Sequence, residues 1–211
     1  RGERFRRVQG HLAGSGGQSV KALERGDVAR PARRLEAGLE ENLRTFFEQD
    51  YPHYQILFAV REGDDPAAAV ARKLIERYPD RDAELIVAGE PPYPNAKVWS
   101  LERMTERARH PILVVSDSDI RATPDYLRGI AADFADPRVG VSTCPYRAVP
   151  GPSFWSLLEA LSLNTEFWCG VLVARMLEGM RFAVGPTMAL RREYLDRAGG
   201  FAATGEYLAE D

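Results

Sequence analysis

Ile112-Leu113-Val114-Val115-Ser116-Asp117-Ser118-Asp119 is the stretch of this sequence that decides its fold. It opens with a short apolar run, which is typical of a strand buried on both faces of a parallel sheet. Two carboxylates at i, i+2 spacing, Asp117 and Asp119, follow the run directly. Open α/β sheets bind their ligands at the carboxyl ends of such strands, so these two acids are candidate ligand-binding residues.

The spacing of Asp117 and Asp119 suits a divalent cation. Mg²⁺ or Mn²⁺ is commonly held by one or two carboxylates together with phosphate oxygens. Such an ion would neutralise the charge of a departing diphosphate. The alternative is structural, because both acids could form Asx turns and cap the next element. The spacing alone leaves both interpretations open.

Short apolar runs and amphipathic segments alternate from Gly38 to the end of the chain, which predicts a sheet with crossover helices. Strands are predicted at residues 55–60, 84–88, 111–116, 139–143 and 182–190. Helices are predicted at residues 39–49, from Asp65-Pro66, from Asn95, from Ser153 and at 191–198, the last closed by Gly199-Gly200. We therefore expect one α/β domain over residues 38–211.

The charge of the chain argues against nucleic acid as a partner. Lys and Arg total 28 against 31 Asp and Glu, a net charge of −3, so no overall basic field attracts phosphates. Residues 1–37 carry several arginines, scattered glycines and few large apolar residues. This composition predicts a poorly ordered basic segment that contributes little to the core. It also lacks the apolar stretch of a signal peptide.

Two further features bear on the compartment. Cys144 and Cys169 lie in no metal-binding spacing, so we expect buried, reduced thiols. The longest apolar stretch, around residues 167–177, is broken by Arg175 and is far shorter than the roughly 20 residues of a spanning helix. We expect that these residues do not cross a membrane.

Polar residues after two other predicted elements are candidates for binding a nucleotide. Asp64 and Asp65 follow a strand, so their carboxylates could reach a base or ribose at the same sheet edge. The alternative is that Asp65 only caps the next helix. Asn95 and Lys97 open a helix, where Lys97 could contact a phosphate of the nucleotide and Asn95 could form hydrogen bonds with the same ligand. Lys97 could instead be a solvated surface lysine.

The residues that could bind a second substrate, the acceptor of a transferred group, are marked by weaker sequence signals. Glu210 and Asp211 could deprotonate an acceptor hydroxyl, although a lone acid pair is not specific. The helix predicted from Ser153 carries large apolar side chains that could either fill the core or line a groove for a lipid. These are Phe154, Leu157, Leu158, Leu161 and Trp168.

Seven blocks, in this order and spacing, resemble the family 2 glycosyltransferase fold. They resemble more closely its ceramide glucosyltransferase-like branch, which includes bacterial hopanoid-biosynthesis glycosyltransferases. The blocks lie at residues 38–52, 64–67 (Asp-Asp-Pro-Ala), 94–97 (Pro-Asn-Ala-Lys), 116–121, 185–192, 199–201 (Gly-Gly-Phe) and 207–211 (Tyr-Leu-Ala-Glu-Asp). The resemblance implies a GT-A type fold, in which a mixed, mostly parallel sheet flanked by helices binds a nucleotide sugar.

The resemblance also implies an activity and roles for residues. It implies inverting transfer of a hexose or N-acetylhexosamine from a UDP-sugar to a hydroxyl of a ceramide-like or hopanoid lipid, at the cytoplasmic face of a membrane. Asp65 would contact the nucleotide, Asp117 the donor diphosphate, and Asp117 with Asp119 the Mg²⁺ or Mn²⁺. Asp211 would be the general base. The acceptor region would comprise Trp155, Leu158, Thr165, Glu166, Trp168, Gly185 and Met188.

Two alternatives stay open. A sugar-nucleotide nucleotidyltransferase also places paired acids on Mg²⁺, but it is expected to show a Gly-rich phosphate loop after its first strand. Here Gly14-Ser15-Gly16-Gly17 has no apolar strand before it. A nucleotide-binding domain without turnover is the second alternative. It arises because the family's first membrane helix and its Gln/Arg-x-x-Arg-Trp motif are not found in these 211 residues, from which we expect a truncated catalytic domain.

Overall fold

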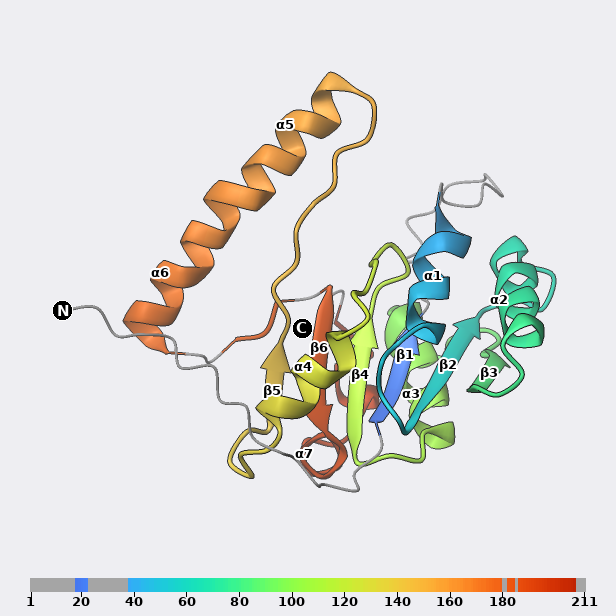
Figure 1. Cartoon of the computed structure of the whole chain (residues 1–211). Helices are drawn as coiled ribbons and strands as arrows, with labels where there is room; N and C mark the ends of the chain where they lie inside the picture. Colours follow the sequence, from blue (N-terminus) through green and yellow to red (C-terminus); the bar gives the residue numbers. More distant parts are fainter. Residues whose placement is uncertain (1–17, 23–37, 180–181, 185, 208–211) are drawn as a thin grey trace.

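The computed structural model describes residues 18–22, 38–179, 182–184 and 186–207, which form one mixed sheet with helices on both faces (Figure 1). The strand order is β3-β2-β1-β4-β6-β5. The strands are β1 (Gln18–Ala22), β2 (Tyr54–Val60), β3 (Asp82–Val87), β4 (Ile112–Ser116), β5 (Val141–Thr143) and β6 (Thr187–Arg191). Strands β1 to β4 pair in parallel, and β6 runs antiparallel to both β4 and β5. The predicted mixed, mostly parallel α/β sheet is confirmed.

Helices cover the two faces with separate apolar cores. They are α1 (Leu39–Phe47), α2 (Pro66–Arg77), α3 (Ala96–Arg107), α4 (Tyr126–Asp133), α5 (Phe154–Ser162), α6 (Trp168–Glu178) and α7 (Arg192–Arg197). Val114 of β4 packs in the core formed with α1, α2 and α4, whereas its neighbour Val115 packs with Val98 and Leu101 of α3. This division follows because successive side chains of a strand point to opposite faces.

Three predicted helix starts are confirmed by their caps. The Asp65 carboxylate accepts a hydrogen bond from the Ala67 amide at 2.7 Å, and Pro66 occupies the first turn of α2. Asn95 accepts from the Val98 amide at 3.1 Å, and Ser153 accepts from the Ser156 amide at 3.1 Å. Each cap satisfies an amide that has no partner inside its helix.

One prediction about residues 1–37 is wrong. The backbone of Gln18–Ala22 forms β1, which lies between β2 and β4 in the middle of the sheet. The sequence Gln-Ser-Val-Lys-Ala has no apolar run, and its alternation is limited to Val20 and Ala22, so the pattern alone does not mark a buried strand. The remaining residues of this segment, 1–17 and 23–37, lie outside the described residues.

Other boundaries differ from the predictions. Helix α4 was not predicted, β5 begins at Val141 instead of residue 139, and β6 begins at Thr187 instead of residue 182. Residues 182–184 precede β6 as a loop, in which the Val184 amide donates to the Thr143 hydroxyl at 2.9 Å. This contact holds the start of β6 beside the end of β5.

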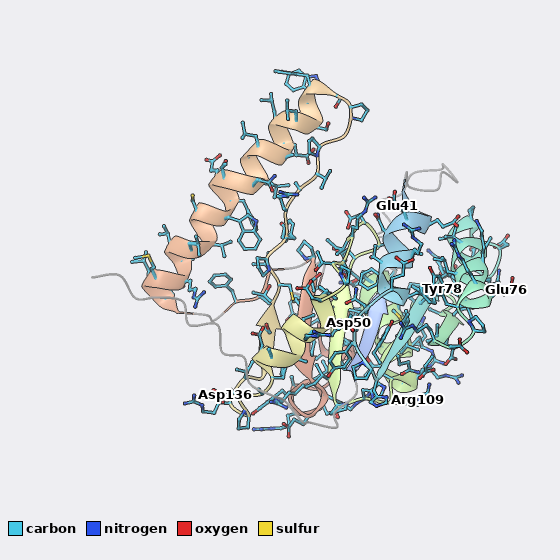
Figure 2. All side chains as sticks on the ribbon, in the orientation of Figure 1. Glu41, Asp50, Glu76, Tyr78, Arg109 and Asp136 are labelled. Atoms are coloured by element: carbon cyan, nitrogen blue, oxygen red, sulfur yellow. The ribbon has the colours of Figure 1, made fainter. Side chains whose placement is uncertain are left out.

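Between β5 and β6 the chain forms a long helix that projects from the sheet (Figure 1). It consists of α5, a π-turn (Leu163–Phe167) and α6, and Ala160 is the only side chain of α5 and α6 that is buried. Figure 2 shows side chains projecting from it along its whole length. Trp155 is 76% exposed and Leu158 is 42% exposed, so the interpretation of this apolar face as core is wrong.

Two related predictions also need correction. Phe154–Glu178 is a continuous helical segment of 25 residues with mean hydropathy 1.3, long and apolar enough to span a membrane, which the stretch 167–177 alone is not. Counting apolar residues only between charges underestimated it, because Glu159, Glu166 and Arg175 lie within a mostly apolar helix. Cys169 lies exposed on this helix, whereas Cys144 is half-buried and burial raises the pKa of its thiol to about 11.

Candidate active site

Asp117 lies at the carboxyl end of β4, where the sheet changes from parallel to antiparallel pairing. Its backbone amide donates to the Pro186 carbonyl at 3.1 Å, and the hydroxyls of Ser116 and Thr187 lie 3.2 Å apart just below it. The turn after Asp117 closes with a hydrogen bond from the Ile120 amide to the Asp117 carbonyl at 3.2 Å. These contacts fix the backbone that carries both acids.

Helix α1 supports the same turn from the other side. The Ala122 amide donates to the Thr45 hydroxyl at 3.0 Å, and Ser118 is buried. Asp117 is half-buried, whereas Asp119 is exposed. The turn therefore presents two carboxylates of different exposure at one point of the sheet edge.

Lys97 is the charged partner of Asp117. Its ammonium group lies 3.1 Å from the Asp117 carboxylate, and its side chain is only 19% exposed. The alternative of a solvated surface lysine is therefore wrong. The first turn of α3 brings this positive charge to the carboxyl end of β4, where an anionic group such as a phosphate would meet it.

Asn95 has two structural roles, and the sequence predicted only the first, which is to start α3. Its amide oxygen caps α3, and its amide nitrogen donates to the Tyr207 carbonyl at 2.9 Å. The Asn95 backbone amide donates to the Gly205 carbonyl at 3.2 Å. A Cβ atom on Gly205 would lie 2.8 Å from the Tyr93 ring, so the loop can approach this closely only with glycine there. Asn95 thus holds the start of α3 against the segment that leads toward Asp211.

Asp65 lies at the same edge of the sheet as Asp117. It follows β2, which is separated from β4 by β1, and all three strands are parallel. Its carboxylate caps α2, as its structural alternative predicts, while Asp64 beside it is exposed. Asp64 and Asp65 stay predicted donor-binding residues.

The acids fit a divalent cation that also binds a diphosphate. Across residues 38–179, 182–184 and 186–207, no group of three or more His, Cys, Asp or Glu side chains gathers around a point that could hold a metal. Mg²⁺ needs fewer protein ligands when phosphate oxygens and water complete its coordination, and it prefers oxygen ligands of the kind that Asp117 and Asp119 offer. The donor atoms present therefore suit this cation.

A tyrosine that the sequence analysis missed lies near the two acids. Burial, and then the charges of Asp117 and Asp119, raise the pKa of Tyr146. Its ring lies 5.4 Å from the Trp168 ring, centroid to centroid, and its carbonyl accepts a hydrogen bond from the Trp168 indole at 2.8 Å. Tyr146 follows β5 in an irregular loop, where no sequence pattern marks a functional side chain.

The other predicted acceptor residues divide into three groups. Trp155, Leu158, Thr165 and Glu166 are exposed on the projecting helix. Met188 is buried within β6, where it pairs with Val115, so it does not form part of an open acceptor surface. Gly185 and Asp211 lie outside the described residues.

A mixed, mostly parallel sheet with paired acids and a half-buried lysine at one edge is the arrangement expected of a glycosyltransferase catalytic domain. Comparison with known protein families identifies the family within this class. The sequence profile of Glycosyl transferase family 21 matches residues 18–211, and the chain belongs to this family. The match begins at β1, in agreement with the place of that strand in the sheet.

Ceramide glucosyltransferases are among the similar proteins. Ceramide glucosyltransferase 1 of Caenorhabditis elegans is 30% identical over 186 residues, which are 87% of this chain and 40% of that protein. Ceramide glucosyltransferase 3 of the same organism is 28% identical over the same shares. The chain thus spans about 40% of the length of these relatives. The resemblance to the ceramide glucosyltransferase-like branch is confirmed.

Solved structures agree on the GT-A type fold. Mannosyltransferase PcManGT from Pyrobaculum calidifontis, in complex with GDP-Man and Mn²⁺, has a TM-score of 0.59 at 23% identity. The match covers 88% of this chain and 47% of the mannosyltransferase chain. Glucosyl-3-phosphoglycerate synthase from Mycobacterium tuberculosis, in complex with Mg²⁺ and UDP, has a TM-score of 0.51 at 16% identity. This match covers 86% of this chain and 58% of the synthase chain.

Proposed function

We propose that this chain is the catalytic part of an enzyme that transfers a hexose from a UDP-sugar to a hydroxyl group of a membrane lipid of ceramide type. The observation that carries the proposal is the Lys97–Asp117 pair at the carboxyl edge of the sheet, beside an exposed apolar helix. The names of the relatives support a glucosyl donor and a ceramide acceptor. The nucleotidyltransferase alternative is dropped, because the chain belongs to a glycosyltransferase family.

The donor half of the site would bind the nucleotide diphosphate. Asp65 and Asp64 would contact the nucleoside. The Lys97 ammonium would exchange its contact with Asp117 for one with a diphosphate oxygen. Asp117 and Asp119 would hold Mg²⁺ or Mn²⁺, which stabilises the negative charge of the departing diphosphate. Backbone hydrogen bonds hold the turn that carries Asp117 and Asp119, and the Asn95 cap holds the start of α3 that carries Lys97, so little reorganisation is needed on binding.

The acceptor half would place a lipid hydroxyl beside the sugar. Asp211 would accept the proton of that hydroxyl as its oxygen attacks the anomeric carbon, which gives inversion in a single displacement. Tyr146 would orient the hydroxyl, because it lies near the two acids and its ring contacts the Trp168 ring. Its phenol hydroxyl can both donate and accept a hydrogen bond.

Ligand-dependent melting tests the donor half. UDP with Mn²⁺ should raise the melting temperature by several degrees at saturation, because a ligand that binds only the folded state stabilises it by mass action, by about 2.7 kcal/mol at 100 times its Kd. Asp117→Asn should lose the metal-dependent part of this shift. The matched control is Asp136→Asn, since Asp136 lies at the opposite edge of the sheet, beside Arg191 and so beside the start of β4 (Figure 2).

Transfer of radiolabelled glucose from UDP-glucose to ceramide in detergent tests the acceptor, with a hopanoid alcohol as the competing acceptor. An equal melting shift in Asp117→Asn and the parent would contradict the donor site. A shift without any transfer would favour the alternative of a nucleotide-binding domain without turnover.

A further inference from the structure

The apolar helix between β5 and β6 does not stand alone. The irregular segment that precedes it, residues 144–153, runs back along its side. Ser156 donates a hydrogen bond to the Gly151 carbonyl at 2.9 Å, and Asn164 binds both the Ala148 amide at 2.8 Å and the Ala148 carbonyl at 2.9 Å. Figure 1 shows the two segments side by side. We call them together the helix–loop unit, residues 144–178.

The hydrogen bonds between the loop and the helix argue against a helix that spans the membrane. At about 1.5 Å per residue the helix is roughly 37 Å long, enough for the roughly 30 Å of hydrocarbon. If it spanned the bilayer, the loop bound along it would enter the hydrocarbon too. That loop contains Pro145, Pro150, Pro152 and the charged Arg147, and irregular backbone in contact with lipid leaves its amides and carbonyls without partners.

The exposed apolar side chains instead suit a position along the surface of the bilayer. On α5 they lie at i, i+3, i+4 and i+7, at Phe154, Leu157, Leu158 and Leu161, with Trp155 beside them three residues before Leu158. On α6 they lie at Leu172, Val173, Met176 and Leu177. Away from them, Ser156, Ala160, Asn164 and Trp168 recur at every fourth position and include the residues that bind the loop. We call the exposed set the apolar stripe.

We propose that the helix–loop unit lies flat in the head-group region of a bilayer, with the apolar stripe toward the acyl chains and the loop toward water. The choice of a lipid partner rests on the proposed function, whereas the orientation rests on the contacts between loop and helix. The helix–loop unit carries Arg147 and Arg175 against Glu159, Glu166 and Glu178. Attraction to anionic lipid therefore contributes nothing, and burial of the apolar stripe drives binding.

Vesicle co-sedimentation tests the surface. The 211-residue chain should bind neutral phosphatidylcholine vesicles, and high salt should not release it. Leu158→Asp and Trp155→Asp should each weaken binding about tenfold, because they replace apolar side chains that would be buried in lipid. The control Val141→Asp changes an exposed apolar side chain on β5, outside the apolar stripe, and should bind like the parent.

Cysteine accessibility tests the orientation. In a chain with Cys144 and Cys169 replaced by serine, Ser153→Cys and Glu178→Cys mark the two ends of the helix. A membrane-impermeant maleimide added outside the vesicles should label both. Protection of one end would mean a spanning helix and would overturn the proposal. No vesicle binding by the parent, equal binding by the stripe variants, or a dimer that the stripe variants dissociate would overturn it as well.

UDP and Mn²⁺ binding is measured on the same preparations, so the two proposals can fail separately. Donor binding without vesicle binding would reject the membrane surface and leave the proposed donor site intact. Vesicle binding without donor binding would reject the proposed function and leave the surface intact.

Discussion

Among the acids at the carboxyl edge of the sheet, Asp117 is set apart by its partner. Lys97 is largely buried and lies 3.1 Å from it, whereas Asp64 and Asp119 are exposed. A half-buried pair of this kind holds both charged groups in position. A bound diphosphate can replace Asp117 as the partner of Lys97, and its cation can replace Lys97 as the partner of Asp117. The lysine is therefore the residue that most directly tests how the donor binds.

Lys97→Gln should weaken binding of UDP with Mn²⁺ by at least about tenfold. Hydrogen bonds to charged groups contribute about 1.5–3 kcal/mol, and glutamine keeps the length of the side chain but not its charge. Isothermal titration measures the change. Lys73→Gln is the control, because Lys73 pairs with Glu40 on the exposed surface of α2. An unchanged Kd in Lys97→Gln would remove Lys97 from the donor site.

Asn95 gives a prediction about stability instead of binding. Asn95→Ala should lower the free energy of unfolding by about 2 kcal/mol, since it removes the cap of α3 and leaves the Tyr207 carbonyl without its amide partner. Urea denaturation measures this loss. Ser153→Ala removes only an exposed cap and should cost about 1 kcal/mol or less. Equal effects of the two substitutions would contradict the role of Asn95 as a link between α3 and the Tyr207 segment.

Tyr146 gives a prediction about the acceptor. Tyr146→Phe should raise KM for ceramide about tenfold and leave the affinity for UDP with Mn²⁺ within about twofold, because it removes one hydroxyl and keeps the ring against Trp168. Tyr194→Phe, on α7, is the control. A loss of donor affinity in Tyr146→Phe would place the hydroxyl on the donor instead, and unchanged kinetics would give it no role in the reaction.

At the scale of the elements, the strand Ile112–Ser116 and the capped helix starts could be predicted, because their signals are local. A buried apolar run and an Asp-Pro or Asn cap carry the information within a few residues. Strand β1 could not be predicted. It is fixed by pairing with β2 and β4 on either side, and these contacts are far apart in the sequence.

The same limit applies to the site. Asp65, Asp117 and Lys97 each follow or open an element, so their common edge could be deduced from topology. Tyr146 and Asn164 could not be found, because a loop that packs on a helix has no periodicity. The apolar helix itself could be predicted, but its exposure could not. The same apolar pattern occurs in helices that face a core and in helices that face lipid.

A proline in the central strand tests the place of β1. Val20→Pro removes a backbone amide from a strand that has neighbours on both sides, and proline is tolerated essentially only at sheet edges. The substitution should abolish cooperative thermal unfolding, as followed by circular dichroism. Val8→Pro, in the segment predicted to contribute little to the core, should leave the melting temperature unchanged. A normal melting curve for Val20→Pro would contradict the central position of this strand.

At the scale of the whole molecule, the chain combines two parts with different surfaces. The sheet and its covering helices bury their apolar side chains, while the helix between β5 and β6 exposes most of its own. The two parts meet around Tyr146 and Trp168, close to Asp117 and Asp119. A water-soluble donor and a lipid acceptor would approach this point from opposite sides.

This division predicts that the sheet folds without the helix. The ends of the inserted segment lie together, because the Thr143 hydroxyl donates to the Val184 carbonyl at 3.1 Å and accepts from the Val184 amide at 2.9 Å. Replacing residues 145–183 with a short Gly-Ser linker should therefore close β5 onto β6 without strain. The shortened chain should keep its affinity for UDP with Mn²⁺ within about threefold, and it should lose vesicle binding and transfer to ceramide completely.

Circular dichroism, isothermal titration and vesicle co-sedimentation on the shortened chain measure these three properties. A second deletion of residues 154–178 alone serves as the comparison, because it retains Tyr146 but not Trp168. It should keep donor binding and lose vesicle binding in the same way. If either shortened chain fails to fold, or folds but no longer binds UDP, the helix supports the donor site itself, and the separation of the molecule into a donor half and a lipid half is wrong.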